Sequence, residues 1–426
     1  MSTAIGIVTT ARTRFVRAFF GNFFTLLVMA IAVSQWAVLW WLFPGAMHTL
    51  PGVLQVGAPL PIYLLNRTLA ARTQRRWRVR TATSGWVRLY YATAFTSLFC
   101  AVFLLLVGIL WLSATTFVGA IAAHAGTAHA AFAADSTIGT FCRWLGNTGL
   151  GVIGLMFAYG YSIGQHRLKV VSLRLPLRNG ADTLNGLRIV QISDIHIGQN
   201  LKRAELERFV ARVSALDPDL VCITGDIADS PAADLEGFLP ILAQLRARYG
   251  VFAILGNHDH RTGADHVAAA LRRLTPFTVL RDEHVSLAIN GHPLHVVGLD
   301  DRGYNWAHGM PHVPYLEAAV AVLPPGEPIL LLCHRPDIFP QAIAEGVALT
   351  LAGHTHGGQL AVPWFNGRVR NLAEFITAFD RGLFERDGSY LYVNCGLGVT
   401  AQRIRLNAPR EITLIEVQAT ALAAAA

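Results

Sequence analysis

The spacing of hydrophobic residues divides the chain into two parts. Up to about residue 165, long apolar runs follow one another with few charges, whereas from about residue 169 short runs rich in β-branched residues alternate with amphipathic stretches. A run of about 20 apolar residues can cross the hydrocarbon core of a membrane, and alternating strand and helix patterns indicate a layered α/β domain. The pattern therefore predicts an all-α transmembrane region of about four helices followed by an α/β domain.

Four apolar stretches in the first part are long enough to be considered as membrane spans. The first is expected to be retained and not cleaved as a signal peptide, because Trp36 and Trp40 mark a membrane interface. The second contains Pro51 and Pro59, so a straight helix is not secure there. The expected spans lie near residues 22–43, 49–65, 90–113 and 144–162.

Charge is distributed unevenly between the two parts. Residues 1–165 hold eleven arginines and one acidic residue, Asp135, for a net charge of +10, while the rest of the chain carries −2. Seven of these arginines fall between the second and third expected spans, and short loops rich in Arg stay on the cytoplasmic side. We therefore predict a multi-pass protein of the inner (plasma) membrane whose C-terminal domain is cytoplasmic. The near-neutral second part argues against nucleic-acid binding, which needs clustered positive charge. The sequence leaves the oligomeric state open.

The second part is expected to contain one large domain. Residues 166–185 form a connector with a first strand, residues 186–418 form the α/β domain, and residues 419–426 are an Ala-rich tail. The predicted strands are residues 187–192, 220–224, 251–255, 294–299, 329–333, 348–352, 390–394 and 412–417. The predicted helices are residues 203–215, 233–248, 264–274 and 315–322.

Polar motifs directly follow five of these predicted strands. A pair of divalent cations about 3.5 to 4 Å apart needs a shared carboxylate with several neutral imidazoles and oxygens, and the motifs supply this mixture. In an extended D-x-H or H-x-H segment, residues two apart project on one side and can reach the same ions. In chain order the motifs are Asp194-Ile195-His196, Gly225-Asp226-Ile227-Ala228-Asp229, Gly256-Asn257-His258-Asp259, Cys333-His334 and Gly353-His354-Thr355-His356-Gly357-Gly358.

This ordered set of motifs resembles the calcineurin-like metallophosphoesterase superfamily over roughly residues 185–418. The segments SDIHIG, GHTHGGQ and VNCGLG are most similar to a bacterial membrane-associated or exported branch, the YkuE/YaeI-like phosphoesterases. The resemblance implies a four-layer αββα sandwich and a hydrolase with two divalent metal ions. Manganese is the expected metal, and iron and zinc accept the same mixed ligands.

The resemblance also implies a role for each motif residue. His258 would face the substrate, protonating the leaving oxygen or stabilising charge on the phosphorane, and Asp229 would orient its ring. Asp259 occupies a more variable position and is expected to be supporting only. The nucleophile would be a hydroxide that bridges the two metals. The implied ligands are Asp194, His196 and His356 for one ion, Asn257, His334 and His354 for the other, and Asp226 as the bridge.

Three further groups of residues are candidates for substrate selection. The loop 300–306 could cover the site, and a plain surface loop is an equal alternative. The side chains of residues 362–365 could enter a bilayer and admit a lipid-linked phosphate, although core packing is the favoured interpretation. Arg335, Arg403 and Arg405 could each bind phosphate oxygens, or each could be a solvated surface residue.

The sequence as a whole favours a membrane-anchored, metal-dependent phosphoric ester or pyrophosphate hydrolase. Its expected partners are membrane lipid and a phosphorylated substrate, either a small molecule or a lipid-linked phosphate. A metal-dependent nuclease is one alternative, disfavoured by the charge of the second part. A non-catalytic membrane scaffold or sensor with a vestigial metal site is another, disfavoured because every ligand position is filled.

Overall fold

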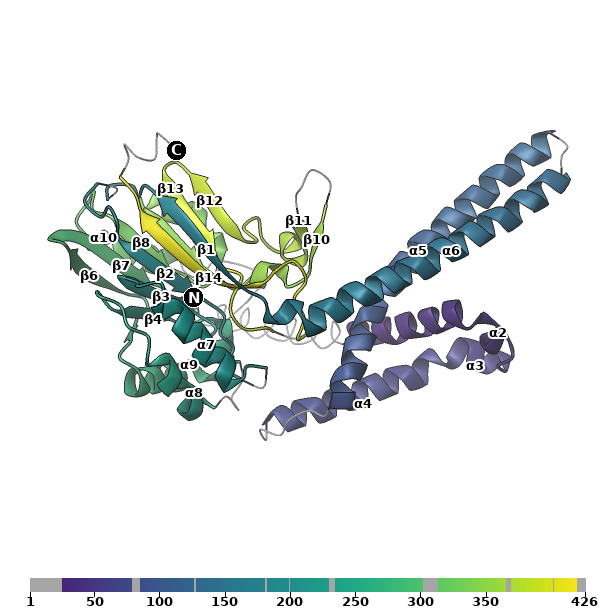
Figure 1. The fold of residues 1–426 in the computed structure, drawn as a ribbon, viewed down its shortest axis with the longest axis horizontal. Helices are drawn as coiled ribbons and strands as arrows, with labels where there is room; N and C mark the ends of the chain where they lie inside the picture. The colour runs from purple at the N-terminus through teal and green to yellow at the C-terminus, as the bar shows by residue number, and fades with distance from the viewer. Residues whose placement is uncertain are drawn as a thin grey trace, which may run out of the picture. The chain divides into compact units, whose positions relative to one another are not determined.

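The fold is seen in a computed structural model (Figure 1) that describes residues 25–78, 85–125, 128–180, 182–198, 200–229, 234–301, 313–364, 369–400 and 402–419. The chain forms two compact units. The first takes in most of residues 1–158, and the second runs from Tyr159 to the C-terminus.

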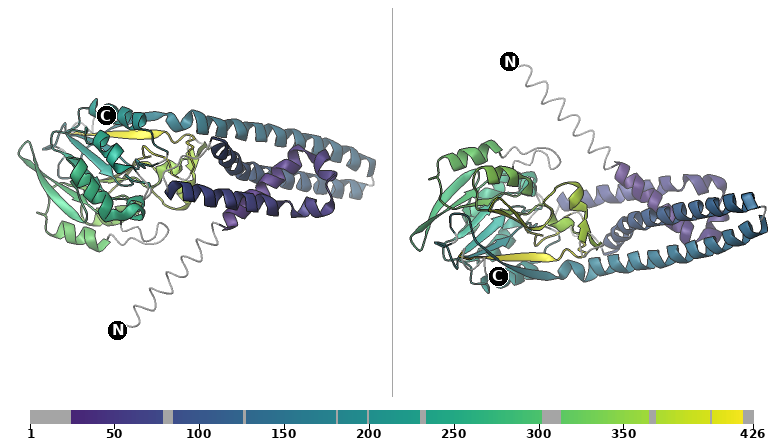
Figure 2. Two further views of the ribbon diagram at one scale, coloured as in Figure 1. Left: turned by 90° about the horizontal axis from the view of Figure 1, so that it is seen from below. Right: turned by 90° about the horizontal axis from the view of Figure 1, so that it is seen from above.

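The first unit consists of helices joined by short turns in its described residues. Figure 2 shows α5 and α6 as a long antiparallel pair. After a helix over Thr25–Leu42, the elements are α2 (Pro44–His48), α3 (Gly52–Gly57), α4 (Pro59–Arg78), α5 (Gly85–Ala125) and α6 (Ala128–Ser162), whose last turn belongs to the second unit.

Two helices in the described part of the chain are long and apolar enough to cross a membrane, Thr25–Leu42 and Gly85–Ala125. They cover the first and third expected spans. The second expected span is interrupted after Gly57, and α4 starts at Pro59, because proline lacks an N–H and suits the first position of a helix. Between the third and fourth expected spans, the described residues 114–125 and 128–143 are helical.

Polar side chains bond between helices of the first unit. Asn66 is buried, donates to Gln35 Oε1 at 2.9 Å and accepts from the Tyr90 hydroxyl at 2.9 Å. Trp41 Nε1 donates to Asn147 Oδ1 at 2.9 Å. Hydrogen bonds of this kind hold apolar helices in register where hydrophobic contacts do not discriminate between alternatives.

The second unit is built on two mixed six-stranded sheets (Figure 1). The first sheet has the order β1-β14-β2-β3-β4-β5, with β2, β3 and β4 parallel. Its strands are β1 (Leu168–Leu175), β2 (Arg188–Ile192), β3 (Leu220–Thr224), β4 (Val251–Ile254), β5 (Thr278–Val279) and β14 (Arg410–Val417). The second sheet has the order β12-β13-β9-β8-β7-β6, with β7, β8, β9 and β13 parallel. Its strands are β6 (Glu283–Ile289), β7 (His292–Gly298), β8 (Ile329–Leu332), β9 (Leu349–Ala352), β12 (Gly382–Arg386) and β13 (Ser389–Val393).

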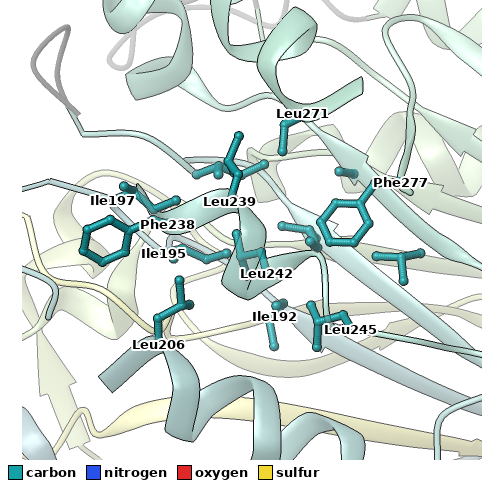
Figure 3. Close-up of a cluster of buried hydrophobic side chains, with 14 of the residues drawn as sticks. Ile192, Ile195, Ile197, Leu206, Phe238, Leu239, Leu242, Leu245, Leu271 and Phe277 are labelled. Carbon is teal, nitrogen blue, oxygen red and sulfur yellow. The ribbon is translucent and has the colours of Figure 1, made fainter. Parts of the chain in front are cut away.

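Three clusters of buried apolar side chains lie between the layers of this unit. One lies between the sheets, where Ile189 and Leu330 are fully buried. A second joins the first sheet to three helices through residues such as Ile192 and Leu242 (Figure 3). A third joins the second sheet to two short helices. The flanking helices are α7 (Arg203–Ser214), α8 (Leu235–Leu242) and α9 (Asn257–Leu274) on one side, and α10 (Val313–Ala321) and α11 (Phe339–Ala344) on the other.

The eight predicted strands are all present, with ends shifted by at most two residues. Parallel strands covered on both faces read as continuous apolar runs, which is why these were found. Among the strands that were not predicted, β6 and β12 are sheet edges with partly exposed, mixed residues. The helix predicted over 264–274 starts earlier, at Asn257, and is kinked at Gly263.

Candidate metal centre

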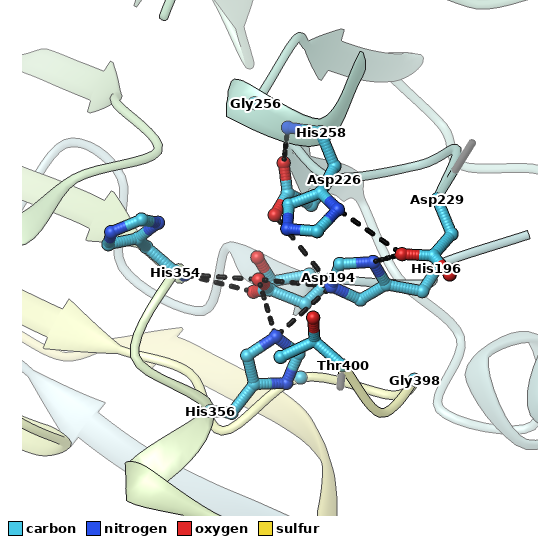
Figure 4. Close-up of polar contacts among 12 residues, drawn as sticks. Asp194, His196, Asp226, Asp229, Gly256, His258, His354, His356, Gly398 and Thr400 are labelled. Carbon is cyan, nitrogen blue, oxygen red and sulfur yellow. Dashed lines mark hydrogen bonds and ion pairs between the residues drawn. The ribbon is translucent and has the colours of Figure 1, made fainter. Parts of the chain in front are cut away.

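The polar motifs gather where the central strands of both sheets end. Parallel strands carry their carboxyl ends to one edge, and α/β enzymes place their chemistry there. The structure brings all nine predicted site residues to this edge. Figure 4 labels all of them except Asn257 and His334. Asp194 and His196 follow β2, Asp226 and Asp229 follow β3, Asn257 and His258 follow β4, His334 follows β8, and His354 and His356 follow β9.

The backbone of these loops is unusual. Asp194, His196, Asp226, His354 and His356 all have φ between 50° and 70°. The predicted extended D-x-H and H-x-H geometry is therefore wrong, and the side chains converge through tight left-handed turns instead. Such conformations cost about 1 to 3 kcal/mol each in non-glycine residues and concentrate at functional sites.

One group of converging ligand atoms belongs to Asp194, His196 and His356. The Nε2 atoms of His196 and His356 lie 3.1 Å apart, and His356 Nε2 lies 3.4 Å from Asp194 Oδ1. All three side chains are buried. Two ring nitrogens and a carboxylate oxygen directed at one point are a ligand set for a divalent cation.

A second group is formed by Asp226, His334 and His354. His334 Nε2 lies 3.3 Å from Asp226 Oδ2 and 3.3 Å from His354 Nδ1. The other ring nitrogen of His334 bonds to the Thr224 carbonyl at 2.7 Å, which fixes the ring and leaves Nε2 to face the site.

Asn257 supplies an independent test of whether a cation fits here. Its Oδ1 is buried and accepts no hydrogen bond from the residues that the structure describes. A buried carbonyl oxygen without a partner costs about 1 to 3 kcal/mol, and coordination to a metal ion would satisfy it. The nitrogen and oxygen donors therefore fit divalent cations.

Asp226 belongs to both groups. Its Oδ2 lies 3.7 Å from His196 Nε2 and 3.3 Å from His334 Nε2. Its Oδ1 accepts the backbone N–H of His258 at 2.8 Å. One carboxylate between two sets of imidazoles is the arrangement expected for a shared ligand.

The pKa values of the two imidazoles in the second group are shifted in opposite directions. Burial alone would lower the pKa of His334, but the charges of Asp226 and Asp194 outweigh it and raise that pKa to about 10. Burial, followed by the charge on His334, lowers the pKa of His354 to about 3. The carboxylates therefore require positive charge at this point, which a cation would supply in place of the His334 proton.

Asp229 stands between two histidines. Its Oδ1 lies 3.2 Å from His196 Nδ1 and 3.2 Å from His258 Nδ1. These contacts outweigh burial and hold the pKa of Asp229 well below its usual range. The His258 ring is partly exposed, and its Nε2 lies 3.3 Å from Arg261 Nη1. Arg261 was not singled out from the sequence, because nothing in its local pattern marks it.

Asp259 has a larger structural part than its predicted supporting role. Its fully buried carboxylate accepts three backbone N–H groups, from Gly256 at 2.9 Å, Ile227 at 3.1 Å and Ala228 at 2.7 Å. These amides flank Asp226 and Asn257. Asp259 therefore joins the two loops that carry those side chains.

Neighbouring atoms lie so close to two of the motif glycines that a side chain would not fit there. A Cβ at Gly256 would lie 2.3 Å from Asp226 Oδ1, and one at Gly353 would lie 2.0 Å from Ser193 Oγ. Gly353 also precedes His354, whose N–H donates to Asp194 Oδ2 at 3.1 Å. Any side chain at either position would push a carboxylate out of place.

The three arginines that were candidates for phosphate binding or for a solvated surface position differ in burial. Arg405 is fully buried, and its guanidinium donates to carbonyls that include those of Cys395 and Gly398. Arg335 is also buried, and its Nε donates to Asp301 at 2.7 Å. The solvated-surface interpretation is therefore wrong for these two residues, and phosphate binding by them stays a prediction. Arg403 is partly exposed, 3.8 Å from Glu205.

The two segments considered for substrate selection also differ from expectation. Asp300 and Asp301 are buried, so they are not part of a plain surface loop, and residues 302–306 lie outside the described part. Val362 and Trp364 are 46% and 54% exposed, so the favoured core-packing interpretation is wrong for them, while Phe365 lies outside the described residues.

Known proteins share these features. A family model described as calcineurin-like phosphoesterase matches residues 187–358. The uncharacterized metallophosphoesterase YkuE of Bacillus subtilis is 30% identical over 239 residues, which are 55% of this chain and 80% of YkuE. The chain belongs to the calcineurin-like metallophosphoesterases. It is therefore a metal-dependent hydrolase of phosphate esters.

Two further relatives match the chain over a similar length. The "Transmembrane protein with metallophosphoesterase domain" of Bos taurus is 30% identical over 59% of this chain and 57% of its own length. The chain thus spans less than two thirds of that relative. The UDP-2,3-diacylglucosamine pyrophosphatase LpxG of Chlamydia trachomatis is 27% identical over 61% of this chain and 92% of LpxG. A relative named for a transmembrane character and the two apolar helices together support membrane association.

Proposed function

We propose that this metallophosphoesterase hydrolyses a phosphomonoester, phosphodiester or pyrophosphate bond at a centre that holds two divalent cations. Asp194, His196 and His356 would bind one cation, Asn257, His334 and His354 the other, and Asp226 both. The observation that carries the proposal is the position of Asp226 between two sets of converging ligand atoms. The unpartnered Oδ1 of Asn257 supports it independently.

When bound, the cations would polarise the phosphoryl oxygens and lower the pKa of a coordinated water, and manganese is the metal we expect. The protein's own residues would position the substrate and move protons. His258 would face the leaving group, because its ring is partly exposed while the ligands around it are buried. With its Nδ1 3.2 Å from Asp229 Oδ1, His258 would exchange a proton through Nε2.

The reaction can be tested with a reporter ester. Purified full-length protein with Mn²⁺ should release p-nitrophenol from bis-p-nitrophenyl phosphate. Asp226→Asn keeps the side-chain volume but removes the shared charge, and should lower kcat/KM by at least about a hundredfold. Asp387→Asn is the matched control, because Asp387 is exposed in the turn between β12 and β13. Turnover that survives Asp226→Asn would refute the shared-ligand mechanism.

We also propose that the chain is a multi-pass protein of the inner membrane with a cytoplasmic catalytic domain. The support is the arginine content between the second and third apolar stretches, together with the scarcity of charge elsewhere in the first part. A reporter fused after Ala426 tests this orientation. Reporter activity on the periplasmic side would overturn it.

A further inference from the structure

A small lobe stands outside both sheets of the second unit (Figure 1). It consists of the hairpin of β10 (Ala361–Pro363) and β11 (Val369–Asn371), followed by η5 (Leu372–Phe375) and Ile376. Asn371 caps η5, since its side chain accepts the Ala373 N–H at 2.8 Å while Glu374 accepts the Asn371 N–H at 3.0 Å. The described residues 361–364 and 369–376 are called the apolar lobe below.

Exposed hydrophobic side chains concentrate on this apolar lobe. Nine large hydrophobic residues are exposed among the described residues of the second unit, and five of them lie between positions 362 and 376. Phe375 is 88% exposed, which is the extreme value of the set. Apolar side chains gathered at one place on a surface mark a binding site more often than scattered ones do. The five are Val362, Trp364, Leu372, Phe375 and Ile376.

The apolar lobe is continuous with the metal centre. A cavity of about 190 Å³ is lined by His354 and His356 and also by Leu372 and Ile376. The lobe also packs closely against the ligand loop, because a Cβ at Gly358 would lie 2.7 Å from the Asn371 Cβ. A molecule with its phosphate at the histidines would therefore meet hydrocarbon side chains next.

Charge at the lobe is balanced. Arg370 pairs with Glu374 at 2.5 Å, and Arg381 lies 3.7 Å from Asp380. Among the residues that the structure describes here, these pairs leave no surplus charge to attract a second anionic group. The part of the ligand that contacts the lobe should therefore be uncharged and apolar.

We propose that the apolar lobe binds the hydrocarbon chain of an amphiphilic phosphate ester whose phosphate lies at the metal centre. This inference rests on the proposed function and adds the substrate class to it. The occupant is a lipid-like chain and not a protein partner, because the cavity joins the apolar side chains directly to the phosphate position. The same chain carries two helices able to cross a membrane, which would keep the domain where amphiphiles concentrate.

The test compares methylphosphonate with hexylphosphonate, which share the head group and differ by five methylenes. Binding is measured by calorimetry on full-length, Mn²⁺-loaded protein in lipid nanodiscs, with chelated protein as the blank. Each methylene removed from water strengthens binding by about fourfold. Burial of two or three methylenes should therefore make the Kd of hexylphosphonate at least about tenfold lower.

The double variant Leu372→Ser/Ile376→Ser removes the apolar lining, and both side chains are about half exposed, so the fold should tolerate the change. In that variant the Kd ratio should fall below about threefold. Val322→Ser, which removes another exposed hydrophobic side chain outside the cavity lining, should keep the full ratio.

A ratio near one in the unsubstituted protein, or a ratio unchanged in the double variant, would overturn the inference and leave the hydrolytic proposal standing. A change of oligomeric state in the double variant without a change of ratio would overturn it in favour of a self-association surface. Failure to bind either phosphonate would instead refute the proposed phosphate site, and with it this inference.

Discussion

Asp259→Asn changes the hydrogen bonds that support the metal centre without removing a proposed metal ligand. In the structure Oδ2 of Asp259 accepts two backbone N–H groups, from Gly256 and Ile227, and Oδ1 accepts one, from Ala228. Asparagine can place its oxygen toward the pair of amides. It then loses the bond to Ala228, whose N–H would face the new amide group.

The magnitude follows from those contacts. A hydrogen bond to a charged group contributes about 1.5 to 3 kcal/mol, and a buried donor left without a partner costs a similar amount. We take about 3 kcal/mol as the local loss, which corresponds to roughly a hundredfold in an opening equilibrium. Because Asp226 lies between these amides, a small displacement of it should also lower turnover by about ten to a hundredfold.

Hydrogen exchange on the full-length protein measures this loss locally. At pH 8 the carboxyl is ionised, because burial and the charge on Asp226 raise the pKa of Asp259 only to about 6. Exchange in peptides covering 225–229 and 255–258 should be about a hundredfold faster in Asp259→Asn, with β8 unchanged. Asp387→Asn should change neither. Acceleration below about threefold in the site peptides would refute the reasoning.

Three further outcomes follow from the same contacts. Glu205→Gln should destabilise the second unit by about 3 kcal/mol at pH 7, since Arg410, 3.2 Å away and buried, loses its partner. Because burial is outweighed by Arg410 and the folded pKa of Glu205 is lowered, the difference should shrink in thermal unfolding as pH falls below about 4. Gly256→Ala should lower both metal content and turnover although no ligand is removed, because its Cβ would meet Asp226 Oδ1 at 2.3 Å. Treatment with a chelator should abolish hydrolysis, and added Mn²⁺ should restore it, with metal content measured in parallel.

The members of the candidate site could be predicted from the sequence because of strand geometry. Parallel strands buried on both faces leave apolar runs such as residues 220–224, and the residue types that follow them reach one edge whatever the loop conformation. That is why the wrong expectation of extended loops did no harm to the prediction that Asp194 and His356 meet. Their atoms lie 3.4 Å apart although 161 positions separate them in the chain.

Contacts between common residue types that lie far apart in the chain could not be predicted from the sequence. Arg405 and Asp259 carry charges, which are usually solvated, and nothing nearby in sequence marks them as buried. Most of their partners are backbone groups, which have no signature in the sequence. For residues 362–365 of the exposed apolar lobe, core packing was favoured over contact with a lipid, because an aromatic run usually packs in a core.

Arg405 and Asp259 both form hydrogen bonds to the loops that carry the proposed metal ligands. Five ligand residues hold left-handed backbone conformations that together cost several kcal/mol. Asp259 accepts backbone N–H groups on the loops after β3 and β4, and Arg405 donates to carbonyls of residues 395–398, beside Asp194. Such charge-assisted bonds are stronger than neutral ones and can hold the loops in the strained form. We therefore expect the protein itself to set the spacing of the ligands, so that a chelated protein keeps these turns.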